Sequence, residues 1–192
     1  GAETASVLPL AEPGPYHVGT YPVTFTDPNR GNRSVAVTVW YPAVPTPDAS
    51  SIGPLSYAEP HLGGAPYPVI LSSTVTAKTL APIIVSHGFT WISVDGINTY
   101  PHFCTETVDQ PRDLVFALGQ VAASPPKMLQ GMIDADHAGA IGYSFDGLNA
   151  LFLGGARVDP TYYLAQCPPA DAVTQPLVSS GLSAFDCGPA DA

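Results

Sequence analysis

Hydrophobic and polar residues alternate most regularly in the N-terminal third of the chain. Residues 34–41 (SVAVTVWY) are rich in β-branched side chains and alternate strictly, which is typical of a β-strand with one buried face. Residues 16–26 alternate in the same way, and residues 27–32 between the two runs have the composition of a turn. The sequence therefore predicts an antiparallel hairpin, preceded by an extended Pro/Ala/Glu-rich arm at residues 1–15.

After this hairpin the pattern changes to strands that alternate with helices. Residues 42–66 are rich in proline and glycine and are predicted to form a surface loop. The predicted strands that follow are residues 67–72, 89–95 and 138–142, and the predicted helices are residues 76–85, 109–123 and 148–153. Such an alternation with short connections predicts a mostly parallel sheet with helices on both faces.

Composition indicates a globular protein and excludes some partners. The 192 residues are 45% hydrophobic and only 11% charged, which suits one domain with a sizeable core. Sixteen acidic residues against six basic ones give a formal net charge of −10. This charge repels nucleic acid and anionic membranes, so neither is an expected partner, and no apolar run is long enough to span a bilayer. Residues 159–192 contain no convincing strand and are predicted to form a loop-rich excursion.

The strongest candidate for chemistry is Ser144, in the segment 139–147 (GAIGYSFDG). A predicted strand leads to this serine and a predicted helix begins just after it, so its hydroxyl would stand at the C-terminal edge of the sheet, as acyl transfer requires. The Gly-x-Ser-x-Gly motif is imperfect, because Asp146 occupies the position of the second glycine and Gly147 follows one step late. An ordinary turn serine is the competing interpretation, and the strand and helix on either side favour a nucleophile.

Six blocks of sequence, taken in order, resemble the α/β-hydrolases. They are residues 35–43 (VAVTVWYPA), 67–72 (YPVILS), 80–95 (LAPIIVSHGFTWISVD), 109–120 (DQPRDLVFALGQ), 133–147 (IDADHAGAIGYSFDG) and 155–167 (GARVDPTYYLAQC). More narrowly, the chain is similar to bacterial predicted dienelactone hydrolases and to the secreted platelet-activating-factor acetylhydrolase type. The resemblance implies an α/β fold class: the N-terminal part of an α/β-hydrolase sheet, in a single incomplete domain over residues 1–192. It also implies a serine hydrolase that cleaves a carboxylic ester through an acyl-enzyme on Ser144.

The resemblance also implies an oxyanion hole, with one departure from the family. The family has a Ser-His-Gly loop after the strand that residues 67–72 resemble, whereas this strand runs on into Ser73 and Thr74. The Ser-His-Gly at residues 86–88 fits better as the turn before the next strand. We therefore expect the backbone N–H of Phe145, together with that of Ser73 or Thr74, to bind the oxyanion.

The acid and the histidine of the triad follow the serine in this family, but no histidine follows His137 in this chain. We expect a complementary C-terminal polypeptide, cleaved or truncated from this chain, to supply both residues and to complete the sheet. The alternative bases are His87, His102 and His137. Only His102 follows the C-terminal end of a predicted strand, and His137 is expected at the opposite edge of the sheet from Ser144.

A second hypothesis is a non-catalytic α/β-hydrolase-like subunit, structural or binding, that has lost its triad. The missing histidine, the altered loop at residues 72–76 and the substitution by Asp146 favour it. Asp146 and Asp95 are expected to be structural. A small cutinase-like enzyme is excluded, because it also needs a histidine after its serine.

Cysteine usage bears on localisation. Cys167 and Cys187 flank a Pro/Ser/Gly-rich segment and are candidates for a disulfide, with two free thiols as the alternative, while Cys104 stands apart. The N-terminal Gly-Ala-Glu-Thr-Ala looks like a processed end, so a secreted, periplasmic or cell-surface location is expected.

No His/Cys spacing resembles a zinc site, and no metal or organic cofactor is expected. Composition does not identify the ester.

Overall fold

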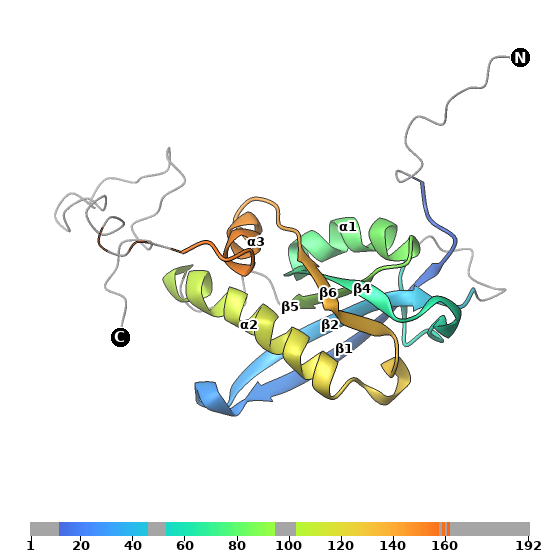
Figure 1. Cartoon of the computed structure of the whole chain (residues 1–192), viewed down its shortest axis with the longest axis horizontal. Helices are drawn as coiled ribbons and strands as arrows, with labels where there is room; N and C mark the ends of the chain where they lie inside the picture. Colours follow the sequence, from blue (N-terminus) through green and yellow to red (C-terminus); the bar gives the residue numbers. More distant parts are fainter. Residues whose placement is uncertain (1–11, 46–52, 95–102, 158, 160, 162–192) are drawn as a thin grey trace, which may run out of the picture.

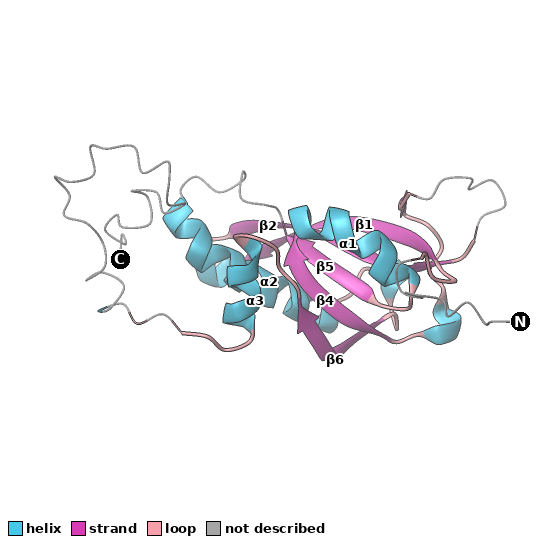
Figure 2. Cartoon of the chain, turned by 90° about the horizontal axis from the view of Figure 1, so that it is seen from above, coloured by secondary structure: helices cyan, strands magenta, loops and turns pink. Residues whose placement is uncertain are grey.

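The computed structural model describes residues 12–45, 53–94, 103–157, 159 and 161. It contains a six-stranded sheet in the order β3-β1-β2-β5-β4-β6, flanked by three helices (Figures 1 and 2). The strands are β1 (His17–Asp27), β2 (Arg33–Ala43), β3 (Leu55–Ser56), β4 (Tyr67–Ser73), β5 (Thr90–Val94) and β6 (Ile133–Ala140). The helices are α1 (Thr74–Ser86), α2 (Phe103–Ala123) and α3 (Asp146–Leu153), with 3-10 turns at Pro28–Arg30, Leu62–Gly64 and Lys127–Leu129.

The pairing of the strands confirms the predicted hairpin and the parallel sheet. β1 and β2 are antiparallel, and β2 pairs antiparallel with β5. β5, β4 and β6 are parallel, so their C-terminal ends meet at one edge of the sheet. β3 was not predicted: it consists of two residues inside the proline-rich segment and pairs parallel with β1. So short a strand leaves no periodicity to detect in the sequence.

Helices cover both faces of the sheet, and each face has its own hydrophobic core (Figure 2). The alternating valines of β2 lie on the α2 face, where they pack with Leu114 and Val121. The opposite face carries Trp40 and Trp91, which pack against the small residues of α1. The valines of residues 34–39 are buried and the residues between them are not, so the alternation reflects one well-buried face; both faces are buried only from Trp40 on.

Two elements begin more than two residues away from their predicted start. β6 begins at Ile133 rather than at residue 138, because Ile133 and Asp134 pair with the first two residues of β4. The register then shifts, so that the next paired residue is Ala138. His137 consequently lies within β6, where it is exposed and its Nδ1 is 2.7 Å from Oδ2 of Asp134. α2 begins at residue 103, earlier than predicted, and runs through Pro111.

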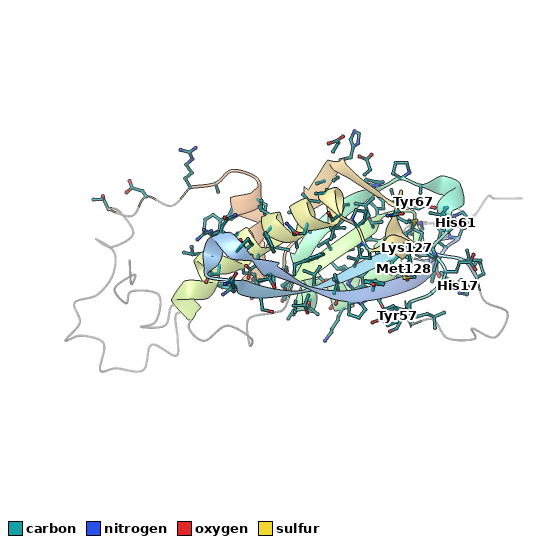
Figure 3. All side chains as sticks on the ribbon, turned by 90° about the horizontal axis from the view of Figure 1, so that it is seen from below. His17, Tyr57, His61, Tyr67, Lys127 and Met128 are labelled. Carbon is teal, nitrogen blue, oxygen red and sulfur yellow. The ribbon has the colours of Figure 1, made fainter. Side chains whose placement is uncertain are left out.

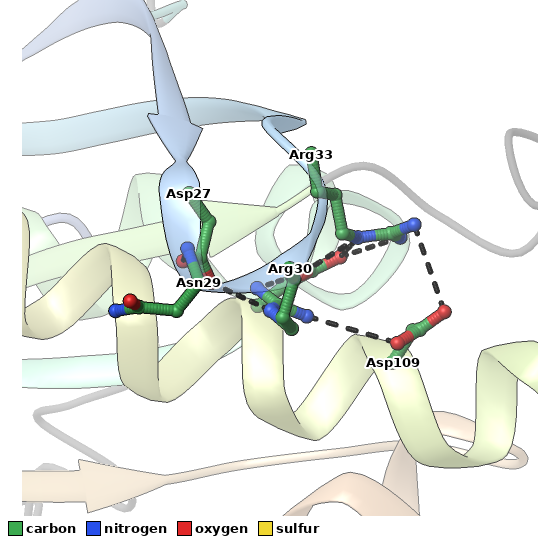
Figure 4. A network of polar contacts seen from close by, with 6 residues as sticks. Asp27, Asn29, Arg30, Arg33 and Asp109 are labelled. Carbon is green, nitrogen blue, oxygen red and sulfur yellow. Dashed lines mark hydrogen bonds and ion pairs between the residues drawn. The ribbon is translucent and has the colours of Figure 1, made fainter.

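A network of ion pairs connects the tip of the β1–β2 hairpin with α2 (Figure 4). Arg33 donates from Nε and Nη2 to the Asp113 carboxylate, at 3.0 and 2.8 Å. Arg30 lies 2.6 Å from both Asp27 and Asp113. The hydrogen bond from Arg30 lowers the pKa of Asp27; burial opposes charge on Arg30, but the two carboxylates raise its pKa overall. The network joins two segments about 80 residues apart in the chain.

Candidate active site

Ser144 lies on a tight turn between β6 and α3. Its φ is +59°, in the left-handed region that costs a residue with a side chain about 1–2 kcal/mol. Two hydrogen bonds close the turn: Asp146 N–H donates to the Tyr143 carbonyl at 3.1 Å, and Gly147 N–H donates to the Ser144 carbonyl at 3.0 Å. Ser144 is exposed. The predicted strand, turn and helix are therefore present, with the serine at the apex.

The two glycines of the motif have different roles. A Cβ on Gly142 would lie 2.0 Å from the carbonyl oxygen of Asp146 and 2.6 Å from the nitrogen of Gly147. Only glycine fits at position 142, because α3 begins directly against it. A Cβ on Gly147 would meet nothing closer than 3.6 Å. Position 147 therefore has room for a side chain, and packing does not require glycine there.

Asp146 is 6% exposed, and its carboxylate accepts hydrogen bonds from two elements. The backbone N–H of Ser73 donates to both carboxylate oxygens at 3.1 Å, and Ser73 Oγ donates to Oδ2 at 3.0 Å. Asn149 Nδ2 donates to Oδ1 at 2.8 Å and also to Gln110 Oε1 of α2. Asp146 thus connects the start of α3 with the end of β4, which agrees with the expected structural role. Sequence reasoning did not find Asn149 or Gln110, since neither belongs to a motif.

The candidate oxyanion donors lie at the same edge of the sheet as Ser144. β4 and β6 are adjacent and parallel, so Ser73 and Thr74 follow one strand end and Phe145 follows the other. The Ser73 N–H is already directed to Asp146. Thr74 is the first residue of α1, where backbone N–H groups have no carbonyl partner within the helix. Of the two residues at the start of α1, Thr74 is therefore the better candidate, and Phe145 stays the candidate on the other strand end.

The described histidines lie away from Ser144. Figure 3 shows His17 and His61 with Tyr67 at the end of the sheet where β1 and β4 begin. His61 Nδ1 is 3.0 Å from the hydroxyl of Tyr67, whose pKa is raised to about 12 by burial and by its hydrogen bond with Tyr16. The seven residues of β4 separate this end from Ser73 by about 20 Å.

Of the remaining candidate bases, His87 and His137 lie within the described residues. His87 follows the C-terminal end of α1, and its Nε2 is 2.9 Å from the Glu12 carbonyl oxygen. His137 is turned toward Asp134 on the exposed part of β6. The predictions for Asp95 and His102 fall outside the described residues, and so does the predicted pairing of Cys167 with Cys187. Within the described part of the chain, the structure therefore brings no imidazole to Ser144.

Membrane-spanning and metal-binding features are absent from the same described ranges. No helix there is both long and apolar enough to cross a membrane. No group of three or more His, Cys, Asp or Glu side chains there is arranged to hold a metal ion.

Comparison with known proteins supports the fold. No protein-family model and no curated protein matches the sequence. Among solved structures, the chain is similar to a ferulic acid esterase from Streptomyces cinnamoneus, with a TM-score of 0.57 and 20% sequence identity, over 76% of this chain and 57% of that chain. The chain thus spans less than two thirds of the esterase's length, and the likeness at this identity concerns the fold alone. The finer similarity to dienelactone hydrolases and acetylhydrolases is not shown. The sheet order, the serine turn and this neighbour together identify the fold as a partial α/β-hydrolase fold.

Proposed function

We propose that this protein is a serine hydrolase that cleaves a carboxylic ester. Ser144 Oγ attacks the ester carbonyl, the alcohol leaves, and water then hydrolyses the acyl-enzyme. The backbone N–H of Phe145, with that of Thr74 as the second candidate, binds the oxyanion. One such donor typically contributes about 3–4 kcal/mol to transition-state stabilisation.

The observation that carries this proposal is the conformation of Ser144. A serine held at a φ of +59° between a parallel strand and a helix is strained, and strain of this kind concentrates at functional sites. The glycine at position 142 allows the helix to start close to the strand, which makes the turn sharp. Asn32 and Tyr57 also have a left-handed backbone, so the proposal depends on this conformation together with the close approach of α3 to Gly142.

The base and its acid are proposed to come from a complementary C-terminal polypeptide. Among the described strands, β6 is an edge of the sheet and pairs only with β4. Two large apolar side chains near it are exposed: Tyr143 is 81% exposed and Leu151 of α3 is 61% exposed. An uncovered parallel edge beside exposed apolar side chains is a surface that another segment would cover. The same segment would place a histidine beside Ser144.

A fluorophosphonate probe tests the proposed nucleophile. Protein expressed from the complete gene should be labelled at one site, and peptide mapping should find the label on Ser144. The Ser144→Ala variant is the matched control and should not be labelled. Absence of label from folded wild-type protein would contradict the proposal and favour the non-catalytic subunit.

Native mass measurement tests the proposed complementary segment. The chain alone has a mass of 19.9 kDa, so the assembled protein should be heavier, either as a longer chain or as a complex that separates under denaturing conditions. A folded, soluble species of 19.9 kDa that reacts with the probe would refute the need for this segment.

A further inference from the structure

We infer that Asp146 is a positioning residue for Ser144: its buried carboxylate anchors the serine turn to the first turn of α1. This inference rests on the proposed function and extends it to a residue that departs from the Gly-x-Ser-x-Gly pattern. The anchor keeps the nucleophile at a set distance from the oxyanion donor that α1 contributes. Three observations support it.

The first observation is the position of Asp146 in the chain. It is two residues after Ser144 and is the first residue of α3, so any movement of its backbone is transmitted to the serine. Its backbone N–H already closes the turn by donating to the Tyr143 carbonyl. The side chain and the backbone of one residue thus hold the turn from two sides.

The second observation is the set of donors around the carboxylate. Ser73 provides two of them, N–H and Oγ, and Ser73 is the last residue of β4 and directly precedes α1. Asn149, one turn further along α3, provides the third and is itself connected to Gln110 of α2. The carboxylate therefore joins α3 and α1 directly, and α2 through one intermediate residue. Thr74, a candidate oxyanion donor, is the neighbour of the anchored Ser73.

The third observation concerns charge. The hydrogen bonds described for Asp146 come from backbone and neutral side chains, and the carboxylate lies at the N-terminal end of α3 and contacts Ser73, the residue before α1. Helix N-terminal ends carry partial positive charge, which stabilises a carboxylate in place of a lysine or arginine partner. An amide at position 146 has the same shape but directs an NH2 group or a weaker acceptor at Ser73 N–H. The anchor thus requires the carboxylate and not merely the volume of the side chain.

The experiment compares Asp146→Asn with a matched control, Glu59→Gln, in protein expressed from the complete gene. Both changes convert a carboxylate to an amide, and Glu59 is exposed in the segment that leads from β3 to β4. Two quantities are measured well below the unfolding temperature: the second-order rate of fluorophosphonate labelling at Ser144, and hydrogen exchange of the Ser73 amide and of residues 142–150. Exchange is read from the folded protein and does not depend on catalysis.

We expect Asp146→Asn to slow labelling by about 10–100-fold, the range that a small displacement of a catalytic group produces. Exchange at Ser73 and at residues 142–150 should rise by at least about tenfold, while Glu59→Gln changes neither quantity. Asp146→Glu, which keeps the charge, should recover part of the labelling rate. A purely structural residue would lower the unfolding temperature and leave the labelling rate of the folded protein unchanged.

The outcomes separate the inference from the function on which it rests. If wild-type protein is labelled and Asp146→Asn is labelled equally fast, the inference is wrong and the proposed function stands. If labelling falls and exchange is unchanged, Asp146 acts on the reaction in some other way than by anchoring, and the inference is again wrong. If folded wild-type protein is never labelled, the proposed function fails and the positioning role fails with it.

Discussion

Replacing Gly142 with alanine is the sharpest test of the serine turn. The new Cβ would lie 2.0 Å from the Asp146 carbonyl oxygen and 2.3 Å from the carbonyl carbon. Real Cβ contacts are essentially never shorter than 3.0 Å, so relief requires a movement of about 1 Å, as the difference between 3.0 and 2.0 Å shows. The three atoms nearest to the new Cβ all belong to the backbone of Asp146 and Gly147, so a change of side-chain rotamer cannot relieve the clash. The start of α3 therefore has to move away from the end of β6.

This movement has two measurable consequences. Overpacking of this kind destabilises a protein by about 1–3 kcal/mol, which urea unfolding detects as a lower midpoint with an unchanged slope. A shift of about 1 Å at a catalytic group also lowers its rate by about 100-fold, which the fluorophosphonate labelling rate at Ser144 reports. Both effects should appear together, because one displacement causes them.

Two other glycines are matched controls for this substitution. A Cβ on Gly139, three residues earlier in β6, would meet only the Ile70 side chain, at 3.7 Å. A Cβ on Gly147 would meet the Gly142 carbonyl oxygen at 3.6 Å, and alanine is favoured over glycine inside a helix. Gly139→Ala and Gly147→Ala should therefore be as stable as wild type or more so. If Gly142→Ala matches them in stability and labelling rate, close contact between α3 and residue 142 is not what shapes the serine turn.

Three further predictions concern strain, buried charge and pH. Ser144→Gly should be about 1 kcal/mol more stable to urea than Ser144→Ala, because glycine relieves the left-handed conformation and alanine does not; equal midpoints would argue against strain. Asp113→Asn should lower the free energy of unfolding by about 3–5 kcal/mol, since Asp113 is buried and pairs with both Arg30 and Arg33. Asp109→Asn is its control and should cost less than about 1 kcal/mol, because its ion pairs are 3.6–3.7 Å long and more exposed. The lowered pKa of Asp27 means that its contribution to stability is complete above the pKa of the unfolded chain and is lost as pH falls through the folded value. Urea midpoints below pH ~4 should thus fall more steeply for wild type than for Asp27→Asn, and parallel curves would contradict this assignment.

Local sequence was sufficient to predict most of the elements. The alternation of residues 34–41 predicts β2 because side chains on a strand point alternately to two faces, and the valines all point to the face that packs on α2. The serine turn was predictable for a similar reason: Gly142, Ser144 and the apolar residues on either side encode strand, turn and helix within about a dozen residues. Pairing and burial elsewhere in the chain are not needed to form these patterns.

The tertiary structure alone decided the features that depend on distant residues. β6 starts five residues earlier than predicted because Tyr67 and Pro68 of β4 offer pairing partners to Ile133 and Asp134. Asp113 is buried in an otherwise amphipathic helix because Arg30 and Arg33 neutralise it from the hairpin.

At the candidate site, the hydrogen-bond partners of Asp146 likewise could not be predicted from the local sequence. Its charge near a helix start was readable from the sequence, but its principal partner is Ser73, which is 73 positions away. A hydrogen bond across that separation forms only after β4 and β6 have paired, since the pairing places their C-terminal ends side by side. Local periodicity therefore determines where strands, helices and the serine turn form, whereas the partners of buried charges are set by contacts that exist only in the folded sheet.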